Sequence, residues 1–215
     1  MVKLSKTSKL DGILSWSLQA LDTCPGSIGS NGELVPACKG CYATTGNYRF
    51  ANVKAPREFN RSDWARDAWV FEMIEALDNS RFFRWFDSGD MYSLELAEKI
   101  LQVMQATPHV SHWMPTRMHK FAKFADVLAR MESLPNVVIR RSSDAINGET
   151  VAGANSSTII SDDAQLPAGA TLCRAYEHEG KCNGCRACYS KNVQIVAYKA
   201  HGVKMAKVIR LALAA

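Results

Sequence analysis

Residues 110–144, VSHWMPTRMHKFAKFADVLARMESLPNVVIRRSSD, contain a complete strand–helix–strand pattern. The flanking parts, 110–117 and 136–144, predict strands, and the apolar residues of 119–134 recur at the spacing of an amphipathic helix. A strand, a crossover helix and a second strand form a βαβ unit, in which the two strands are parallel. The pattern therefore predicts a parallel sheet with helices packed outside it.

The same alternation extends toward the N-terminus. Residues 81–90 predict a buried strand that ends in a glycine turn, and residues 93–107 predict a helix with Ser93 as its N-cap. Further upstream, residues 12–19 predict a strand and residues 55–79 predict one long helix. Strand and helix thus alternate through the middle of the chain, as they do in α/β proteins.

The elements expected near the C-terminus are shorter. Residues 157–161, 171–177 and 193–200 predict three further strands, and a short helix follows the last of them. A chain of 215 residues can form one substantial core, and we expect a single domain over residues 1–215. The expected fold class is α/β, as a partial (β/α) barrel or an open, mostly parallel sheet with helices outside. In either architecture the functional groups lie at the C-terminal ends of the strands.

The composition excludes several classes of protein. Hydrophobic residues make up 47% of the chain and charged residues 22%, as in ordinary globular proteins. The net charge of +5 is not concentrated in a dense Lys/Arg stripe, so nucleic-acid binding is not expected. No secretory signal is visible, so none is expected, and no apolar run approaches the ~18 residues of a membrane-spanning helix. These features predict a cytoplasmic protein without a membrane partner.

The chain contains seven cysteines in two groups. One group follows the first predicted strand, and the other lies in and beyond the sixth. The N-terminal thiols are Cys24, Cys38 and Cys41, and the C-terminal thiols are Cys173, Cys182, Cys185 and Cys188. With parallel strands, both cysteine-rich loops are expected at the C-terminal rim of the sheet. Clustered thiols in a reducing compartment favour metal ligation over disulfides.

The C-terminal thiols have the spacing of an iron–sulfur site. Cys182, Cys185 and Cys188 form a C-x2-C-x2-C run, which can wrap one face of a [4Fe-4S] cluster, and Cys173 completes four ligands. Zinc is the rival metal, although structural zinc sites more often use two separate C-x2-C pairs. We therefore predict a [4Fe-4S] cluster here and keep a zinc site as the alternative.

The N-terminal thiols suggest a second site. Three cysteine ligands leave one iron of a [4Fe-4S] cluster open, and their position after the first strand resembles that in radical S-adenosylmethionine enzymes. The resemblance implies S-adenosylmethionine as an additional cofactor, with the turn Ser88–Gly89–Asp90 in the place of that family's Gly-Gly-Glu turn. The spacing C-x13-C-x2-C departs from the C-x3-C-x2-C typical of those enzymes. One cluster with ligands from both groups is the alternative to two sites.

Charged residues complete the predicted site. Arg117, and the pair Arg140 and Arg141, end two strands at the expected rim. They form either an anion site or salt bridges to nearby carboxylates. Those carboxylates are Asp87, Asp90 and Asp144, of which Asp87 and Asp90 are also a candidate general acid–base pair. The residues assigned to cofactor binding are Ser88, Gly89, Asp90, Arg117 and Arg141.

Two motifs resemble a known family. TCPGS…ACKGCYATTGNY near the start of the chain and CNGCRACYSKNVQIVAYKAHG near its end are similar to the phage "gene product eighty-eight" family of iron–sulfur proteins. The resemblance covers both ends of the sequence. It implies an iron–sulfur protein of bacteriophage origin that acts in the cytoplasm of the host cell.

Two functions agree with these patterns. The first is an iron–sulfur protein that binds at least one [4Fe-4S] cluster and is redox-active or radical-S-adenosylmethionine-like, with a redox partner. The alternative is a non-catalytic protein, in which an iron–sulfur or zinc site staples the two ends of the chain and the surface binds a host or phage protein. The patterns leave it open whether the chain is an enzyme.

Overall fold

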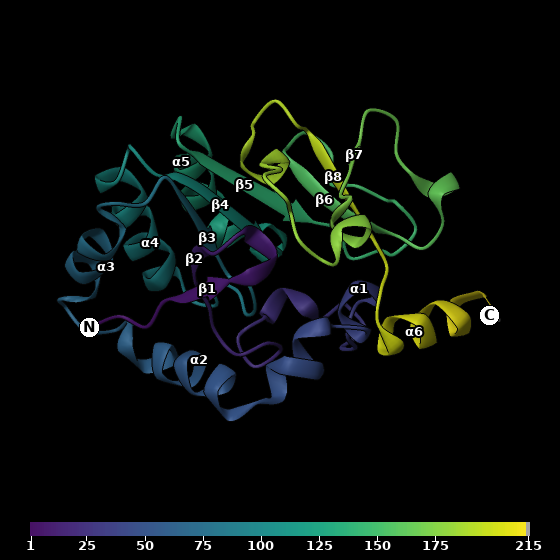
Figure 1. Cartoon of the computed structure of the whole chain (residues 1–215), viewed down its shortest axis with the longest axis horizontal. Helices are drawn as coiled ribbons and strands as arrows, with labels where there is room; N and C mark the ends of the chain where they lie inside the picture. Colours follow the sequence, from purple (N-terminus) through teal and green to yellow (C-terminus); the bar gives the residue numbers. More distant parts are fainter. Residues whose placement is uncertain (214–215) are drawn as a thin grey trace.

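The protein is built on one eight-stranded sheet, seen in a computed structural model that describes residues 1–213 (Figure 1). The strands are β1 (Ser5–Thr7), β2 (Ile13–Trp16), β3 (Phe82–Trp85), β4 (Ser111–Thr116), β5 (Val137–Ser142), β6 (Ser156–Ile160), β7 (Thr171–Leu172) and β8 (Ile195–Lys199). Their order is β1-β2-β3-β4-β5-β6-β8-β7, and only the pair β1–β2 is antiparallel. Because β1 and β7 form free edges, the sheet is open, which confirms the second of the two expected architectures.

Helices cover one face of this sheet. The helices are α1 (Pro36–Lys39), α2 (Ala51–Asp63), α3 (Trp69–Leu77), α4 (Leu94–Ala106), α5 (Ala125–Ser133) and α6 (Val203–Leu213). The apolar sides of α3, α4 and α5 pack against β2 to β5 in the main core. The Ser93 hydroxyl accepts a hydrogen bond from Leu96 N and caps α4, as predicted. Within residues 1–213 no helix is long and apolar enough to cross a membrane.

The helix predicted over residues 55–79 is two helices, α2 and α3. The chain leaves helical geometry after Trp64, whose indole donates a hydrogen bond to the Tyr92 hydroxyl. Lys99 Nζ on α4 donates to the carbonyl oxygens of Trp64, Ala65 and Arg66 at 3.1, 3.1 and 3.2 Å. These carbonyls lie just beyond Asp63, the last residue of α2, so the lysine stabilises the break between the two helices.

The strand predicted over residues 171–177 is much shorter in the structure. Only Thr171 and Leu172 pair with β8, and Cys173 N adds a last hydrogen bond to Ala197 O at 2.8 Å. A 3-10 helix, Ala175–His178, follows. β7 has no strand on its outer side, so the chain can leave the sheet without breaking a second set of hydrogen bonds.

The two faces of the sheet differ in chemistry because side chains alternate along each strand. On the helix face, Trp16 packs against Trp69 and Trp85 with ring centroids 5.3 and 6.2 Å apart. The opposite face carries Arg84, Trp113, Arg140 and Tyr198 and is covered by the loop 173–194, which contains 3-10 turns but no α-helix. We call it the loop face.

His112 is a titratable side chain buried in the helix-face core. Trp85 Nε1 donates to its Nδ1 at 3.2 Å, and its Nε2 lies 2.9 Å from Thr107 Oγ1. Burial lowers the pKa of His112 to about 3. The ring is therefore neutral in the folded protein, with both nitrogens hydrogen-bonded.

We expect acidification to destabilise the fold through this residue. The pKa of His112 falls from 6.5 in the unfolded chain to about 3 in the fold, so the unfolded state binds the proton first as the pH drops. The free energy of unfolding should fall by about 1.4 kcal/mol per pH unit between these two values. Urea unfolding at several pH values measures this slope. His112→Gln should remove it, and the exposed His109→Gln should keep it; equal slopes in all three proteins would contradict the assignment.

Candidate metal centre

The N-terminal thiols lie in the loop that leaves β2, at the C-terminal rim of the parallel strands. A 3-10 helix begins directly after Cys24, and Cys38 lies within α1. Backbone hydrogen bonds close the turns around them, from Ser27 N to Cys24 O at 2.9 Å and from Cys41 N to Cys38 O at 3.1 Å. The expected position of this group is therefore observed.

Residues from the ends of β4 and β5 hold this loop. Lys120 Nζ donates to the carbonyl oxygens of Gly26 and Ile28 at 3.0 and 3.3 Å, and also to Asp144 at 2.7 Å. Ala37 N donates to Asp144 O at 2.9 Å. The loop is thus anchored to two neighbouring strands of the rim.

Burial raises the pKa of each N-terminal thiol, that of Cys24 to about 12. The charge of Asp90 raises the pKa of Cys24 further, whereas the charge of Arg117 lowers those of Cys38 and Cys41. The thiols also raise one another's pKa, so they lie within electrostatic reach of each other. Without a metal these groups are protonated at neutral pH.

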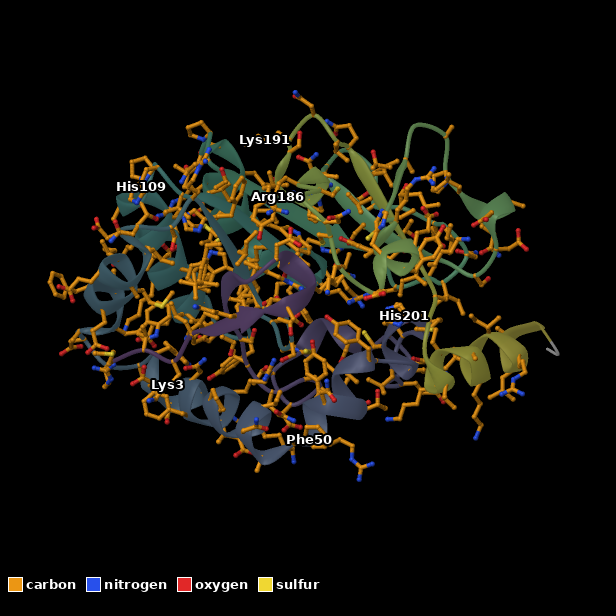
Figure 2. All side chains as sticks on the ribbon, viewed as in Figure 1. Lys3, Phe50, His109, Arg186, Lys191 and His201 are labelled. Carbon is orange, nitrogen blue, oxygen red and sulfur yellow. The ribbon has the colours of Figure 1, made fainter. Side chains whose placement is uncertain are left out.

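The loop with the C-terminal thiols starts at the same rim and then crosses the loop face. Cys173 directly follows β7, but Cys182 N donates to Lys9 O at 2.7 Å, in the turn that precedes β2. Asp11 in this turn accepts a hydrogen bond from Gly184 N at 3.0 Å and pairs with Arg186 at 2.9 Å. Figure 2 shows Arg186 over the purple N-terminal segment. Residues 182–186 therefore lie beside the opposite end of β2, not at the rim.

The C-terminal thiols differ in exposure. Cys188 Sγ lies 3.2 Å from Tyr198 Oη, and burial raises the pKa of Cys188. Burial also raises the pKa of Cys182 to about 11, with added effects from Cys173 and Cys188, so these three thiols interact. Cys185 is exposed.

The thiols are free but do not form a closed metal site in this structure. All seven cysteines are unpaired. Within residues 1–213 no group of three or more His, Cys, Asp or Glu side chains is arranged to hold a metal ion. The chemistry of the donors fits a thiophilic metal, whereas the geometry requires the thiols of each loop to move closer together.

Arg140 anchors the C-terminal loop from inside the sheet. This side chain on β5 is fully buried and donates only to carbonyl oxygens. The acceptors are Cys188 O at 3.1 Å, Ala187 O at 2.8 Å, Ser190 O at 3.0 Å, Val193 O at 2.9 Å and Ser156 O at 3.4 Å. Burial lowers its pKa, and the groups that oppose this shift are Tyr198 and Cys188.

A second buried charge network lies between the two thiol groups. Arg84 Nη1 and Arg57 Nη2 both contact Asp87, at 2.7 and 3.4 Å. The Tyr48 hydroxyl also donates to Asp87. Tyr42, which follows Cys41, donates its hydroxyl hydrogen to Asp87 O at 2.7 Å. Asp87 is therefore paired with Arg84 and Arg57 rather than with Arg117, Arg140 or Arg141, the arginines considered as its partners from the sequence.

The turn Ser88–Gly89–Asp90 joins β3 to the N-terminal loop. Ser88 Oγ donates to Leu18 O at 2.7 Å and accepts from Arg57 Nε at 2.6 Å. Asp90 accepts hydrogen bonds from Thr116 Oγ1 at 2.7 Å and from Arg117 N at 2.9 Å. Burial raises the pKa of Asp90 despite these donors.

The two arginines assigned to cofactor binding have carboxylate partners. Arg117 Nε contacts Asp144 at 3.2 Å and its Nη2 donates to Ser143 O at 2.7 Å, beside the N-terminal thiols. Arg141 projects to the helix face, where both Nε and Nη2 contact Glu132 at 3.0 Å. The structure therefore brings Arg117 to the thiols and places Arg141 away from them.

Sequence patterns did not single out the tyrosines or the separate role of Arg140. Tyr42 and Tyr189 each follow the last cysteine of a group, and both lie near Arg84. The repeated Cys-Tyr pair was the available signal. Arg140 looked equivalent to Arg141, yet strand alternation places their side chains on opposite faces.

Fold and site together define an open α/β protein with two cysteine-rich loops on and beside one face of its sheet. The family model "Gene product 88" matches residues 2–202. The chain therefore belongs to the phage gene product 88 family. No curated protein and no solved structure matches it.

We expect Gly89→Ala to destabilise the protein more than Gly153→Ala. Both glycines have a positive φ, +78° and +73°, so an alanine pays a similar backbone cost of about 1 kcal/mol at each. A Cβ at Gly89 would lie 2.6 Å from Leu18 Cβ and 2.7 Å from Thr23 Oγ1, whereas nothing lies within 4 Å at Gly153. The excess should be about 1–3 kcal/mol in urea unfolding. Equal losses would show that the turn relaxes without cost.

We expect Arg140→Lys to release the C-terminal loop. Lysine keeps the charge but cannot span five carbonyl oxygens with a planar fork. Amide hydrogen exchange of residues 187–193 should become about tenfold faster or more, as expected for the loss of one or two hydrogen bonds. Arg141→Lys is the matched control and should leave this loop unchanged. Protection that survives Arg140→Lys would refute the anchoring role.

Proposed function

We propose that this chain is an iron–sulfur protein that binds a [4Fe-4S] cluster through the C-terminal thiols. The observation that carries the proposal is the buried guanidinium of Arg140. A fully buried charge is normally paired, but the partners of Arg140 are neutral carbonyls, and the ionisable groups acting on it are Cys188 and Tyr198. A metal centre with four thiolate ligands carries net negative charge and would supply the missing anion beside this cation.

The backbone between Cys182 and Cys185 supports ligation from a tight turn. Asn183 and Gly184 have positive φ values of +48° and +80°, so a tight turn separates Cys182 from Cys185. The exposed Cys185 is the thiol that would have to move most to join the other three. Arg140 would keep Cys188 in position through the Cys188 carbonyl while the turn closes.

The N-terminal thiols form a second site in this proposal. Cys24, Cys38 and Cys41 would hold a cluster with one open iron, and S-adenosylmethionine is the cofactor proposed for that position. A cluster bound there would supply single electrons. Asp90 acts electrostatically on Cys24 and Arg117 acts on Cys38 and Cys41, so one acidic and one basic group flank the site.

A non-catalytic role is the second candidate, and one set of contacts favours it. The C-terminal loop is bonded to the turn at Lys9 and Asp11, and α6 packs on α1 beside the N-terminal thiols (Figure 1). A structural iron–sulfur or zinc site would then fasten the two ends of the chain together. In that case the function lies in binding a host or phage protein.

Metal analysis of the protein purified without oxygen tests the proposal. We expect iron and acid-labile sulfide in equal amounts, with visible absorption that bleaches on reduction. Stoichiometric zinc without sulfide would reject the iron–sulfur proposal and support the structural alternative. A protein that binds neither metal would reject both.

Single substitutions separate the two thiol groups. Cys185→Ser should remove the C-terminal cluster and lower the melting temperature, because ligand binding contributes to folding free energy. Cys41→Ser should leave that cluster bound and remove only the iron of the N-terminal site. Iron content and electron paramagnetic resonance of the two variants provide the measurement. Loss of all iron from either variant would favour one cluster with ligands from both groups.

A further inference from the structure

Three neighbouring side chains on the loop face carry buried donors without an acceptor. These donors are Arg84 Nε, Trp113 Nε1 and the Tyr189 hydroxyl. Arg84 Cζ lies 4.6 Å from the centroid of the Trp113 ring, and the Trp113 and Tyr189 ring centroids are 5.6 Å apart. Each unpaired buried donor costs about 1–3 kcal/mol, so a cluster of three points to an acceptor at this place.

The same place has an excess of positive charge. Arg84 and Arg57 share the single carboxylate of Asp87, and all three residues are less than a tenth exposed. The Arg84 fork is only partly used, because Nη1 contacts Asp87 and Nη2 reaches the Tyr42 hydroxyl at 3.5 Å. The Nε edge of the guanidinium is left for a further anion.

Two other unpaired buried donors lack this charge. The indole nitrogens of Trp16 and Trp69 are also buried without partners, but they lie in the apolar core of the helix face. The loop-face donors differ because a guanidinium is one of them. Three donors and a surplus cation together fit an oxygen anion, which accepts several hydrogen bonds at once.

We propose that the loop face binds a small oxyanion, a carboxylate or phosphate group, through Arg84, Trp113 and Tyr189. Arg84 and Trp113 come from β3 and β4, whereas Tyr189 comes from the C-terminal loop and follows Cys188. The site is complete only when this loop lies on the sheet. Since Arg84 also contacts Tyr42, which follows Cys41, the anion binds between the two thiol groups. The site does not depend on a bound metal.

Nuclear magnetic resonance of the indole groups tests the proposal on the full chain. Sodium acetate and inorganic phosphate are titrated separately into ¹⁵N-labelled protein, with sodium chloride at the same ionic strength as the control. The Trp113 indole proton should move downfield in a saturable manner with at least one oxyanion, because its N–H gains an acceptor. The Trp69 indole is the internal control and should not move.

Two variants test the other donors. Tyr189→Phe keeps the ring and removes one donor, and it should weaken anion binding about 3- to 10-fold. Arg84→Lys keeps a cation for Asp87 but loses the second donor of the fork, and it should weaken binding at least as much. An unchanged Trp69 resonance shows that a variant is folded. If Arg84→Lys does not fold, the result for Tyr189→Phe alone decides the test.

Three results would overturn the oxyanion site. The first is a Trp113 indole that does not respond to either oxyanion or responds equally to chloride. The second is unchanged affinity in Tyr189→Phe. The third is a Trp113 shift that follows iron loading without any added oxyanion and does not change on its addition, which would assign the acceptor to cluster sulfur.

Discussion

The buried guanidinium of Arg140 is the interaction on which the loop face depends. It lies on a central strand, where burying a charge without hydrogen bonds is unfavourable. Its donors bind five carbonyl oxygens, and these bonds fix the position of the backbone that carries them. Those carbonyls come mostly from the segment 187–193, whose regular structure is the short 3-10 helix Ala187–Tyr189, so one side chain binds most of this segment. Other contacts on this face also involve the loop: Tyr189 packs on Trp113, and Cys188 lies against Tyr198 of β8.

Much of the fold could be predicted from periodicity. The parallel strands β3, β4 and β5 and the helices between them follow patterns that are visible in residues 81–144. The errors occurred where tertiary contacts act. Lys99 satisfies the carbonyls at the end of α2 and so splits a continuous helical pattern, and no residue within 55–79 signals this. The predicted strand over 171–177 was shortened because its outer neighbour is missing at the sheet edge.

The candidate site was predictable in its residue types but not in its geometry. Cysteine spacing identified both loops, and the rule for parallel strands located Cys24, Cys38 and Cys41 at the rim. It could not show that residues 182–186 cross the sheet to Asp11, because that contact depends on a loop path. Nor could it separate Arg140 from Arg141, since the face of each depends on where the strand begins.

The contact between the β1–β2 turn and the C-terminal loop has a consequence for biosynthesis. Asp11 and Gly184 are 173 positions apart in the chain, so this hydrogen bond is among the most non-local in the fold. Residue 184 must leave the ribosome before the loop can reach its place, whereas β2 to β5 can associate earlier. The C-terminal thiols therefore take up their position later than the strands of the main core, and maturation of this part of the molecule is a late step of folding.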